Sequence, residues 1–134
     1  MKIELQQKLF DKYPKIFGQK DLPMTQTCMC WGINCGDGWY WLIDQLCNSI
    51  QGYCDNHVME KACQVEAVQV KEKFGGLRFY INGANDTVYG MIDLAEHMSY
   101  GICEECGTLK NVKQRSDGWI HTLCNSCNQK RKRE

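Results

Sequence analysis

The sequence has no apolar run that approaches the roughly 18 residues of a membrane-spanning helix, so a chain anchored by such a helix is excluded. It has no excess of charge, because 16 basic side chains balance 16 acidic ones. That balance argues against a general nucleic-acid coat or a protein of the membrane surface. The first residues interrupt their apolar positions with charges and do not form the apolar core of a signal peptide. We therefore expect a cytoplasmic protein.

Known catalytic signatures are missing too. The sequence contains no His-x-Glu with Pro-Cys-x-x-Cys, no Gly-x-x-x-x-Gly-Lys-Ser/Thr loop, no Gly-x-Ser-x-Gly and no His-Glu-x-x-His. With three histidines in all, a histidine-based metal nuclease would be short of ligands. We expect a protein that binds and is not an enzyme.

Cysteine is abundant, with ten residues. In a reducing compartment, well-spaced cysteines indicate metal ligation before disulfides. Cys103 and Cys106 form one Cys-x-x-Cys pair, and Cys124 and Cys127 form a second pair after 17 intervening residues. Two such turns direct four thiolates at one point and complete a tetrahedral shell around zinc. Because a four-sulfur shell leaves no open position, we expect one structural zinc per chain.

Two alternatives to this ligand set stay open. His121 lies three residues before Cys124 and could replace a ligand, although an ordinary strand position is favoured. The other six cysteines have no familiar ligand spacing and are typical of small buried hydrophobes. A second metal site could still combine three of them, Cys28, Cys30 and Cys35, with Cys63 or His57. The remaining two are Cys47 and Cys54.

Apolar periodicity predicts an α+β fold in two parts. Residues 1–101 form a small helix and β-hairpin domain, and residues 102–134 form a zinc finger with a basic tail. The order of cysteine turn, small hairpin and helix is that of a treble clef, a zinc-ribbon-like module. Asp37 is placed to cap the second helix. The predicted elements are helices at about 3–13, 38–51 and 86–99, and a hairpin at about 65–82.

The central hairpin carries the candidate ligand-binding face. If Gly75 and Gly76 form its loop, Lys73 lies opposite Arg78 and Lys71 lies opposite Tyr80. These four side chains then share one face, with cations for phosphate and a ring for a base. An ordinary solvated strand face is the alternative interpretation.

Three motifs resemble a group of small proteins encoded by phages and prophages. They are Cys-Gly-Asp-Gly-Trp at 35–39, Val-Lys-Glu-Lys-Phe-Gly-Gly-Leu-Arg-Phe-Tyr at 70–80, and a final Cys-x-x-Cys-Gly with Gly-Trp-x-x-Thr-Leu-Cys at 118–124. The resemblance covers roughly residues 35–127. It implies an accessory phage protein of the host cytoplasm, a class that includes counter-defence factors that sequester nucleotide immune signals.

Three functional hypotheses follow. The first is a zinc-stabilised counter-defence protein that sequesters a small anionic signal, such as a nucleotide second messenger, on the hairpin face. The second is a nucleic-acid-binding regulator that uses the zinc finger and the basic residues Lys130 to Arg133. The third is an inhibitor that docks on a host protein through Trp31, Tyr40 and Trp41. A membrane partner is not expected, and a homo-oligomer is compatible with the sequence.

Overall fold

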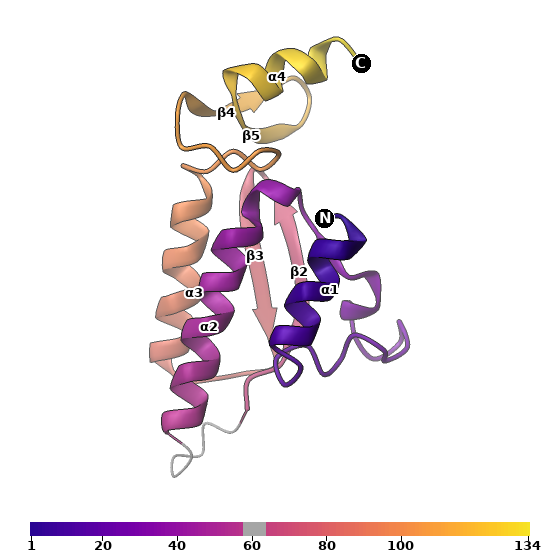
Figure 1. Ribbon diagram of the computed structural model, residues 1–134, viewed down its shortest axis with the longest axis vertical. Coiled ribbons are helices and arrows are strands. Elements are labelled where there is room, and N and C mark those ends of the chain that lie inside the picture. Colours follow the sequence, from indigo (N-terminus) through magenta and orange to yellow (C-terminus); the bar gives the residue numbers. More distant parts are fainter. Residues whose placement is uncertain (58–63) are drawn as a thin grey trace.

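The computed structural model describes residues 1–57 and 64–134, and these form a mixed α+β protein, as the sequence predicts. A three-stranded sheet with its helices makes the main body, and residues 102–134, the C-terminal module, lie at one end of it (Figure 1). Within the described ranges, none of the helices has the length and apolar character needed to cross a membrane. The elements of the main body are α1 (Ile3–Lys12), η1 (Met29–Trp31), β1 (Ile33–Asn34), η2 (Asp37–Trp39), α2 (Tyr40–Asn56), β2 (Ala67–Lys73), β3 (Gly76–Ile81) and α3 (Asp86–Ser99).

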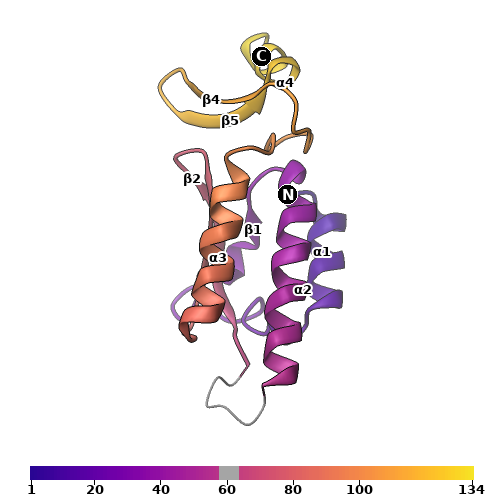
Figure 2. The same ribbon diagram turned by 90° about the vertical axis from the view of Figure 1, so that its left-hand side faces the viewer.

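The sheet has the strand order β1-β2-β3, with β1 parallel to β2 and β3 antiparallel to β2. The helices α1 and α2 lie on one side of the sheet (Figure 2), and α3 packs along β3 (Figure 1). The backbone N–H of Leu77 donates to Ser99 Oγ at 3.0 Å, which fixes the last turn of α3 against β3. The sheet face turned away from α1 and α2 is therefore the face available to solvent.

The hydrophobic core lies between the sheet and these helices. Side chains alternate in direction along a strand, so Val70 on β2 and Leu77 and Phe79 on β3 point the same way and are buried. The ring of Phe17 meets the ring of Phe79 edge-on, with centroids 6.4 Å apart. Trp39, at the start of α2, is fully buried. Burying each such large side chain contributes about 1.5–3 kcal/mol.

The turn between β2 and β3 is Phe74-Gly75, and the predicted turn at Gly75-Gly76 is wrong. Phe74 has φ 53° and Gly75 has φ 81°, the two positive values that a type I′ hairpin turn requires. Glu72 Oε1 accepts a 2.9 Å hydrogen bond from Gly75 N–H, which holds the turn. Gly76 is instead the first residue of β3.

The strand register shifts with the turn. Lys71 lies opposite Arg78 and Lys73 lies opposite Gly76, so the predicted opposition of Lys73 and Arg78 is wrong. From Gln69 to Lys73, each β2 residue faces a β3 residue two positions earlier than predicted, and the register is irregular between Ala67 and Gln69. Because side chains alternate with a period of two, this shift leaves the facing residues of the two strands on their predicted faces. Phe74, which the predicted register places on the core face, lies instead in the turn and is 63% exposed.

Two of the three predicted helices have nearly their predicted bounds. The third, α2, begins at Tyr40 after the short turn η2 and continues to Asn56, past the predicted end at 51. Gly52 lies inside α2 and does not end it. Before α3, the Asn85 side chain caps the helix by accepting a 3.2 Å hydrogen bond from Val88 N–H.

The C-terminal module consists of a cysteine-bearing turn, a small hairpin and a short helix. The hairpin strands β4 (Val112–Ser116) and β5 (Ile120–Cys124) are antiparallel, and α4 (Asn125–Lys132) follows β5 directly. The buried side chains of the module are few: Leu123 and two cysteines form its small core, with Val112 packed against them.

Candidate metal centre and polar sheet face

The structure brings together the four cysteines that the sequence predicts as ligands. The sulfur atoms of Cys103, Cys106, Cys124 and Cys127 all lie within 4.8 Å of one another. The distance between Cys106 Sγ and Cys124 Sγ is 3.8 Å. Cys103 and Cys124 are buried, whereas Cys106 is exposed. This arrangement fits a structural metal site.

Local backbone geometry positions each pair of sulfurs. The first pair lies on a tight turn, closed by the Gly107 N–H donating to Cys103 O at 2.8 Å. Gly107 has φ 80°, a conformation that costs glycine little. The second pair lies at the start of α4, where Cys124 is the N-cap and its sulfur accepts from Cys127 N–H at 3.4 Å.

The four thiols interact with one another electrostatically. The N–H of Cys127 lowers the pKa of the Cys124 thiol to about 7. Burial and the neighbouring sulfurs raise the pKa of Cys127. Four ionised sulfurs this close would repel one another. A bound metal cation offsets their negative charge, and thiols that coordinate a metal are deprotonated. The arrangement is therefore suited to holding a metal.

His121 lies outside the sulfur cluster, on β5 opposite Arg115. Its position is the ordinary strand position that the sequence favoured. Its Nε2 is buried, and no hydrogen-bond partner for it lies among the described residues.

The structure offers no second metal site within residues 1–57 and 64–134, where the four-cysteine group is the one cluster that could hold an ion. Cys63, one of the proposed partners, lies outside the described residues. Cys35 is buried, and burial together with nearby Glu104 raises the pKa of its thiol to about 12. Cys47 and Cys54 are also buried in the main body, which fits their interpretation as small hydrophobes.

The Gly-Asp-Gly motif forms the first contact between the main body and the C-terminal module. Glu104, between the first two cysteines, accepts hydrogen bonds from Gly36 N–H at its carboxylate (2.9 Å) and from Gly38 N–H at its backbone carbonyl (2.7 Å). A Cβ on Gly38 would lie 2.6 Å from Gly107 N. Trp39 Nε1 also donates to Ile102 O at 2.9 Å. Gly36 and Gly38 therefore leave, by having no side chain, the space into which the backbone of the Cys103–Cys106 turn packs.

Asp37 is not the helix cap that the sequence predicts. Neither η2 nor α2 has a side-chain cap hydrogen bond. The Asp37 carboxylate instead accepts from the backbone N–H of Lys2 at 2.8 Å, and its other oxygen lies 3.8 Å from Lys2 Nζ. It holds the N-terminal segment against the start of α2.

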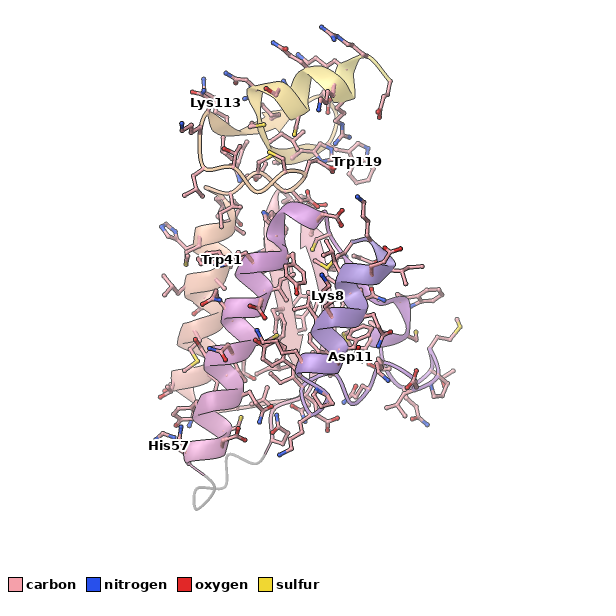
Figure 3. The ribbon with its side chains drawn as sticks, in the orientation of Figure 1. Lys8, Asp11, Trp41, His57, Lys113 and Trp119 are labelled. Carbon is pink, nitrogen blue, oxygen red and sulfur yellow. The ribbon has the colours of Figure 1, made fainter. Side chains whose placement is uncertain are left out.

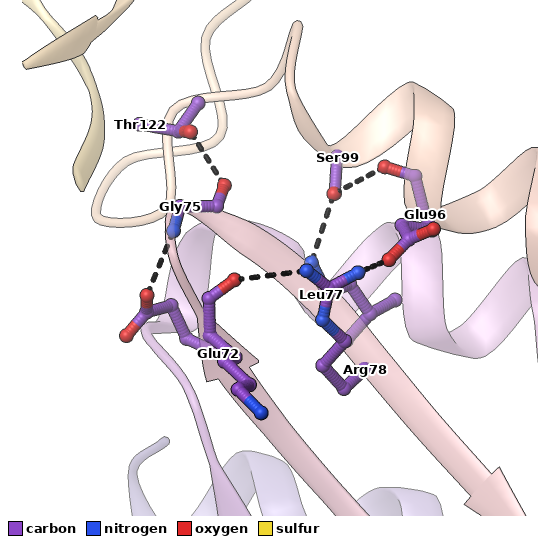
Figure 4. A network of polar contacts seen from close by, with 8 residues as sticks. Glu72, Gly75, Leu77, Arg78, Glu96, Ser99 and Thr122 are labelled. Carbon is purple, nitrogen blue, oxygen red and sulfur yellow. Dashed lines mark hydrogen bonds and ion pairs between the residues drawn. The ribbon is translucent and has the colours of Figure 1, made fainter. Parts of the chain in front are cut away.

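The β2–β3 turn forms the second contact with the C-terminal module. Thr122 on β5 is fully buried, and its hydroxyl donates to Gly75 O at 2.5 Å (Figure 4). A Cβ on Gly75 would lie 3.2 Å from Ile120 Cγ2, so the lack of a side chain at Gly75 lets β5 lie close to the β2–β3 turn. Figure 2 shows the β4–β5 hairpin above this turn. Both glycine motifs of the main body therefore contact the C-terminal module.

The four predicted ligand-binding residues do share one face of the sheet, which we call the polar sheet face. Lys71 and Lys73 lie on either side of the partly buried Glu72 on β2, and Arg78 and Tyr80 lie on either side of the buried Phe79 on β3. Lys73 and Tyr80 are exposed, whereas Lys71 and Arg78 are partly exposed. This face lies away from α1 and α2 (Figure 2).

Arg78 is already engaged by an acidic side chain. Its guanidinium forms an ion pair with Glu96 on α3 and donates to Lys73 O at 3.4 Å (Figure 4). Among the described residues, no carboxylate lies within ion-pair distance of Lys71 or Lys73. The two lysines are thus the cations of the polar sheet face that an external anion can reach without displacing a carboxylate.

The other two candidate surfaces lie elsewhere. The exposed tail cations Lys130 and Arg131 on α4 line a pocket together with the carboxylates of Glu105 and Glu134. Trp41 on α2 projects from the main body, 58% exposed (Figure 3). Figure 3 also shows Lys113 and Trp119 on the β4–β5 hairpin of the C-terminal module.

Sequence reasoning missed three residues that shape these sites: Glu96, Glu104 and Thr122. All three act over a long separation in sequence, so local spacing gives no signal for them. No family model, curated protein or solved structure matches this chain.

Proposed function

We propose that this chain is a non-enzymatic, zinc-stabilised protein that binds a small, anionic, nucleotide-like ligand on its polar sheet face. Sequestration of such a ligand, the counter-defence role implied by the phage resemblance, requires binding and no catalysis. A four-sulfur metal shell suits this function, because a closed shell supports folding and leaves no position for a substrate.

We assign zinc to the four-cysteine site, because a closed shell of four thiolates is typical of structural zinc. Four sulfurs in a tetrahedron at about 2.3 Å from Zn²⁺ lie roughly 3.8 Å from one another. The separation of 3.8 Å between Cys106 Sγ and Cys124 Sγ agrees with that value. The order of cysteine turn, hairpin and helix also agrees with a treble clef. Because the module buries few apolar side chains, the metal supplies much of the stability of its fold.

The observation that carries the ligand proposal is the cluster of three cations on the polar sheet face, two of which have no carboxylate within ion-pair distance among the described residues. Lys71 lies directly opposite Arg78, and Lys73 lies on the same face. Like charges at directly opposed positions destabilise a strand pair. Glu96 neutralises Arg78, so the repulsion that remains is between Lys71 and Lys73, two residues apart on the same face of β2. A phosphate group would relieve the remaining repulsion, and the Tyr80 ring offers a surface for a base.

Nucleic-acid binding through the basic tail is less well supported. Residues 101–134 carry seven basic and four acidic side chains, a net charge of +3. Four thiolates with Zn²⁺ reduce this charge to about +1. Two of the four carboxylates, those of Glu105 and Glu134, share the pocket of the tail cations.

Contact with a host protein is a second candidate function, favoured by one observation. A groove of about 550 Å³ lies where the start of α2 meets the cysteine turn. Its lining is mainly apolar and includes two well-exposed side chains, Trp41 and Leu109. Exposed aromatic residues at the edge of such a groove are typical anchors of protein interfaces.

The ligand proposal is tested by reversing the charge of Lys71 and Lys73, the two lysines that have no carboxylate partner among the described residues. We expect Lys71→Glu with Lys73→Glu to weaken binding of a fluorescent ATP analogue by at least tenfold, since two phosphate contacts are lost. Tripolyphosphate should compete with the analogue on the wild-type protein. The matched control is Lys8→Glu with Lys15→Glu, an equal charge change at exposed positions in and just beyond α1. Wild-type protein that does not bind the analogue, or equal binding by both double variants, would refute the proposal.

A further inference from the structure

A second tyrosine, Tyr100, lies on the polar sheet face. Tyr100 directly follows α3, yet its phenol lies against the first residue of β3, where a Cβ on Gly76 would be 2.7 Å from Tyr100 Cζ. Gly76 is paired with Lys73, and directly opposed residues of a strand pair point to the same face. The ring of Tyr100 is therefore on the face of Lys73, and it is partly exposed.

Tyr100 turns the polar sheet face into two parallel rows. Along β3, the Tyr100 ring over Gly76 is followed by Arg78 and then by Tyr80. Along β2, the facing positions are Lys73 opposite Gly76, Lys71 opposite Arg78 and Gln69 opposite Tyr80. The row along β3 thus has an aromatic ring at each end, Tyr100 and Tyr80. The row along β2 places Lys71 and Lys73 beside the space between these rings.

The spacing of the rings is longer than one nucleotide requires. Four residue steps separate Gly76 from Tyr80, which corresponds to about 13 Å along the strand. A mononucleotide has one base and can stack on one ring only. A chain of nucleotides can stack one base on each ring and place the intervening phosphates beside Lys71 and Lys73. Such stacking is tolerant of sequence, because each base has a π-face.

We infer that the ligand of the polar sheet face is a short single-stranded oligonucleotide, with one base on Tyr80, another on Tyr100 and the linking phosphates along Lys71 and Lys73. This inference rests on the proposed function, because it assigns the ligand class of the same face. Gly76 is the position that admits the second ring: a residue with a side chain there would displace Tyr100.

The experiment measures how affinity depends on ligand length and on each ring. Thymidylate chains of one to six residues are titrated into zinc-loaded protein, together with abasic chains of equal phosphate number. We expect affinity to rise steeply until the chain reaches both rings and then to level off. Tyr80→Leu and Tyr100→Leu should each weaken binding of the longer chains by about fivefold to a hundredfold, the effect of losing one base–ring stack. Neither change should weaken binding of abasic chains.

Controls separate stacking from folding. Tyr80→Phe and Tyr100→Phe keep the rings and should keep the affinity. The melting temperature of each variant is measured, and Tyr80→Leu at an exposed position serves as the test if Tyr100→Leu does not fold. Equal affinity for thymidylate and abasic chains, lost with Lys71→Glu and Lys73→Glu, would overturn the inference and leave the proposed function standing. Affinity that the lysine substitutions do not change would overturn both.

Discussion

Replacing Thr122 by valine tests whether the C-terminal module stabilises the main body. The two side chains have nearly the same shape, and both suit a strand. The change removes the hydroxyl that donates to Gly75 O at 2.5 Å and leaves that carbonyl without this donor. Thr122 is 0% exposed, so water does not replace the lost bond.

The magnitude follows from two opposing effects. An unsatisfied buried carbonyl costs about 1–3 kcal/mol. The added methyl group of valine returns roughly 0.8 kcal/mol of apolar burial. We therefore expect a net loss of about 0.2–2 kcal/mol in the free energy of unfolding, which lowers the melting temperature by roughly 1–8 °C for a chain of this length.

The assay is urea denaturation of the zinc-loaded protein, followed by circular dichroism and by tryptophan fluorescence. Thr87→Val, at an exposed position on α3, is the matched control and should change stability little. After a chelator removes the metal, the module no longer holds Thr122 against Gly75, so wild type and Thr122→Val should unfold at the same urea concentration. Equal stability with zinc bound, or a difference that survives chelation, would refute the reasoning.

Three further outcomes are expected. Cys124→Ser should lose the single zinc per chain in elemental analysis, and its C-terminal module should exchange amide hydrogens rapidly while α2 stays protected. Glu96→Gln should tighten binding of phosphate-bearing ligands several-fold by releasing the guanidinium that Glu96 pairs with, whereas a charge-matched change on α1 should not. Burial raises the pKa of Asp44, but hydrogen bonds from Lys12 and Tyr13 outweigh it and lower the pKa below 3.8. That stabilisation is present above about pH 4 and is lost as the pH falls, so Asp44→Asn should reduce stability at neutral pH and make no difference at about pH 2.

The cluster of four cysteines was predictable because its signal is local. Each Cys-x-x-Cys pair is one turn, and the only long-range requirement is that the two turns meet. The faces of the central hairpin were predictable for a similar reason, since alternation with a period of two survives an error in the turn. The helix α3 and its Asn85 cap also follow from short-range pattern.

The roles of the glycines were not predictable, because tertiary contacts decide them. Gly75 and Gly76 are typical of a two-residue hairpin loop, but only Gly75 belongs to the turn. Gly76 is a glycine because Tyr100 occupies the space of its side chain, and Gly38 is one because the cysteine turn packs there. Phe74 takes the other turn position with a positive φ that sequence reasoning assigns to glycine.

The pairing of Arg78 with Glu96 escaped prediction because it joins β3 to α3 across a contact that no spacing encodes. The sequence suggested three equivalent cations, and the structure distinguishes two of them, Lys71 and Lys73, from the third. The substitutions that test the ligand proposal are therefore those of Lys71 and Lys73.

The most direct test of the account is to map where a phosphate-bearing ligand touches the protein. Zinc-loaded protein labelled with nitrogen-15 is titrated with a short thymidylate chain, and the shift of each backbone amide signal is followed by NMR. The account predicts the largest shifts at residues 69–73 and 76–80 and at Tyr100. Shifts confined to α1, to the groove at Trp41 or to the basic tail, or no shifts at all, would contradict it.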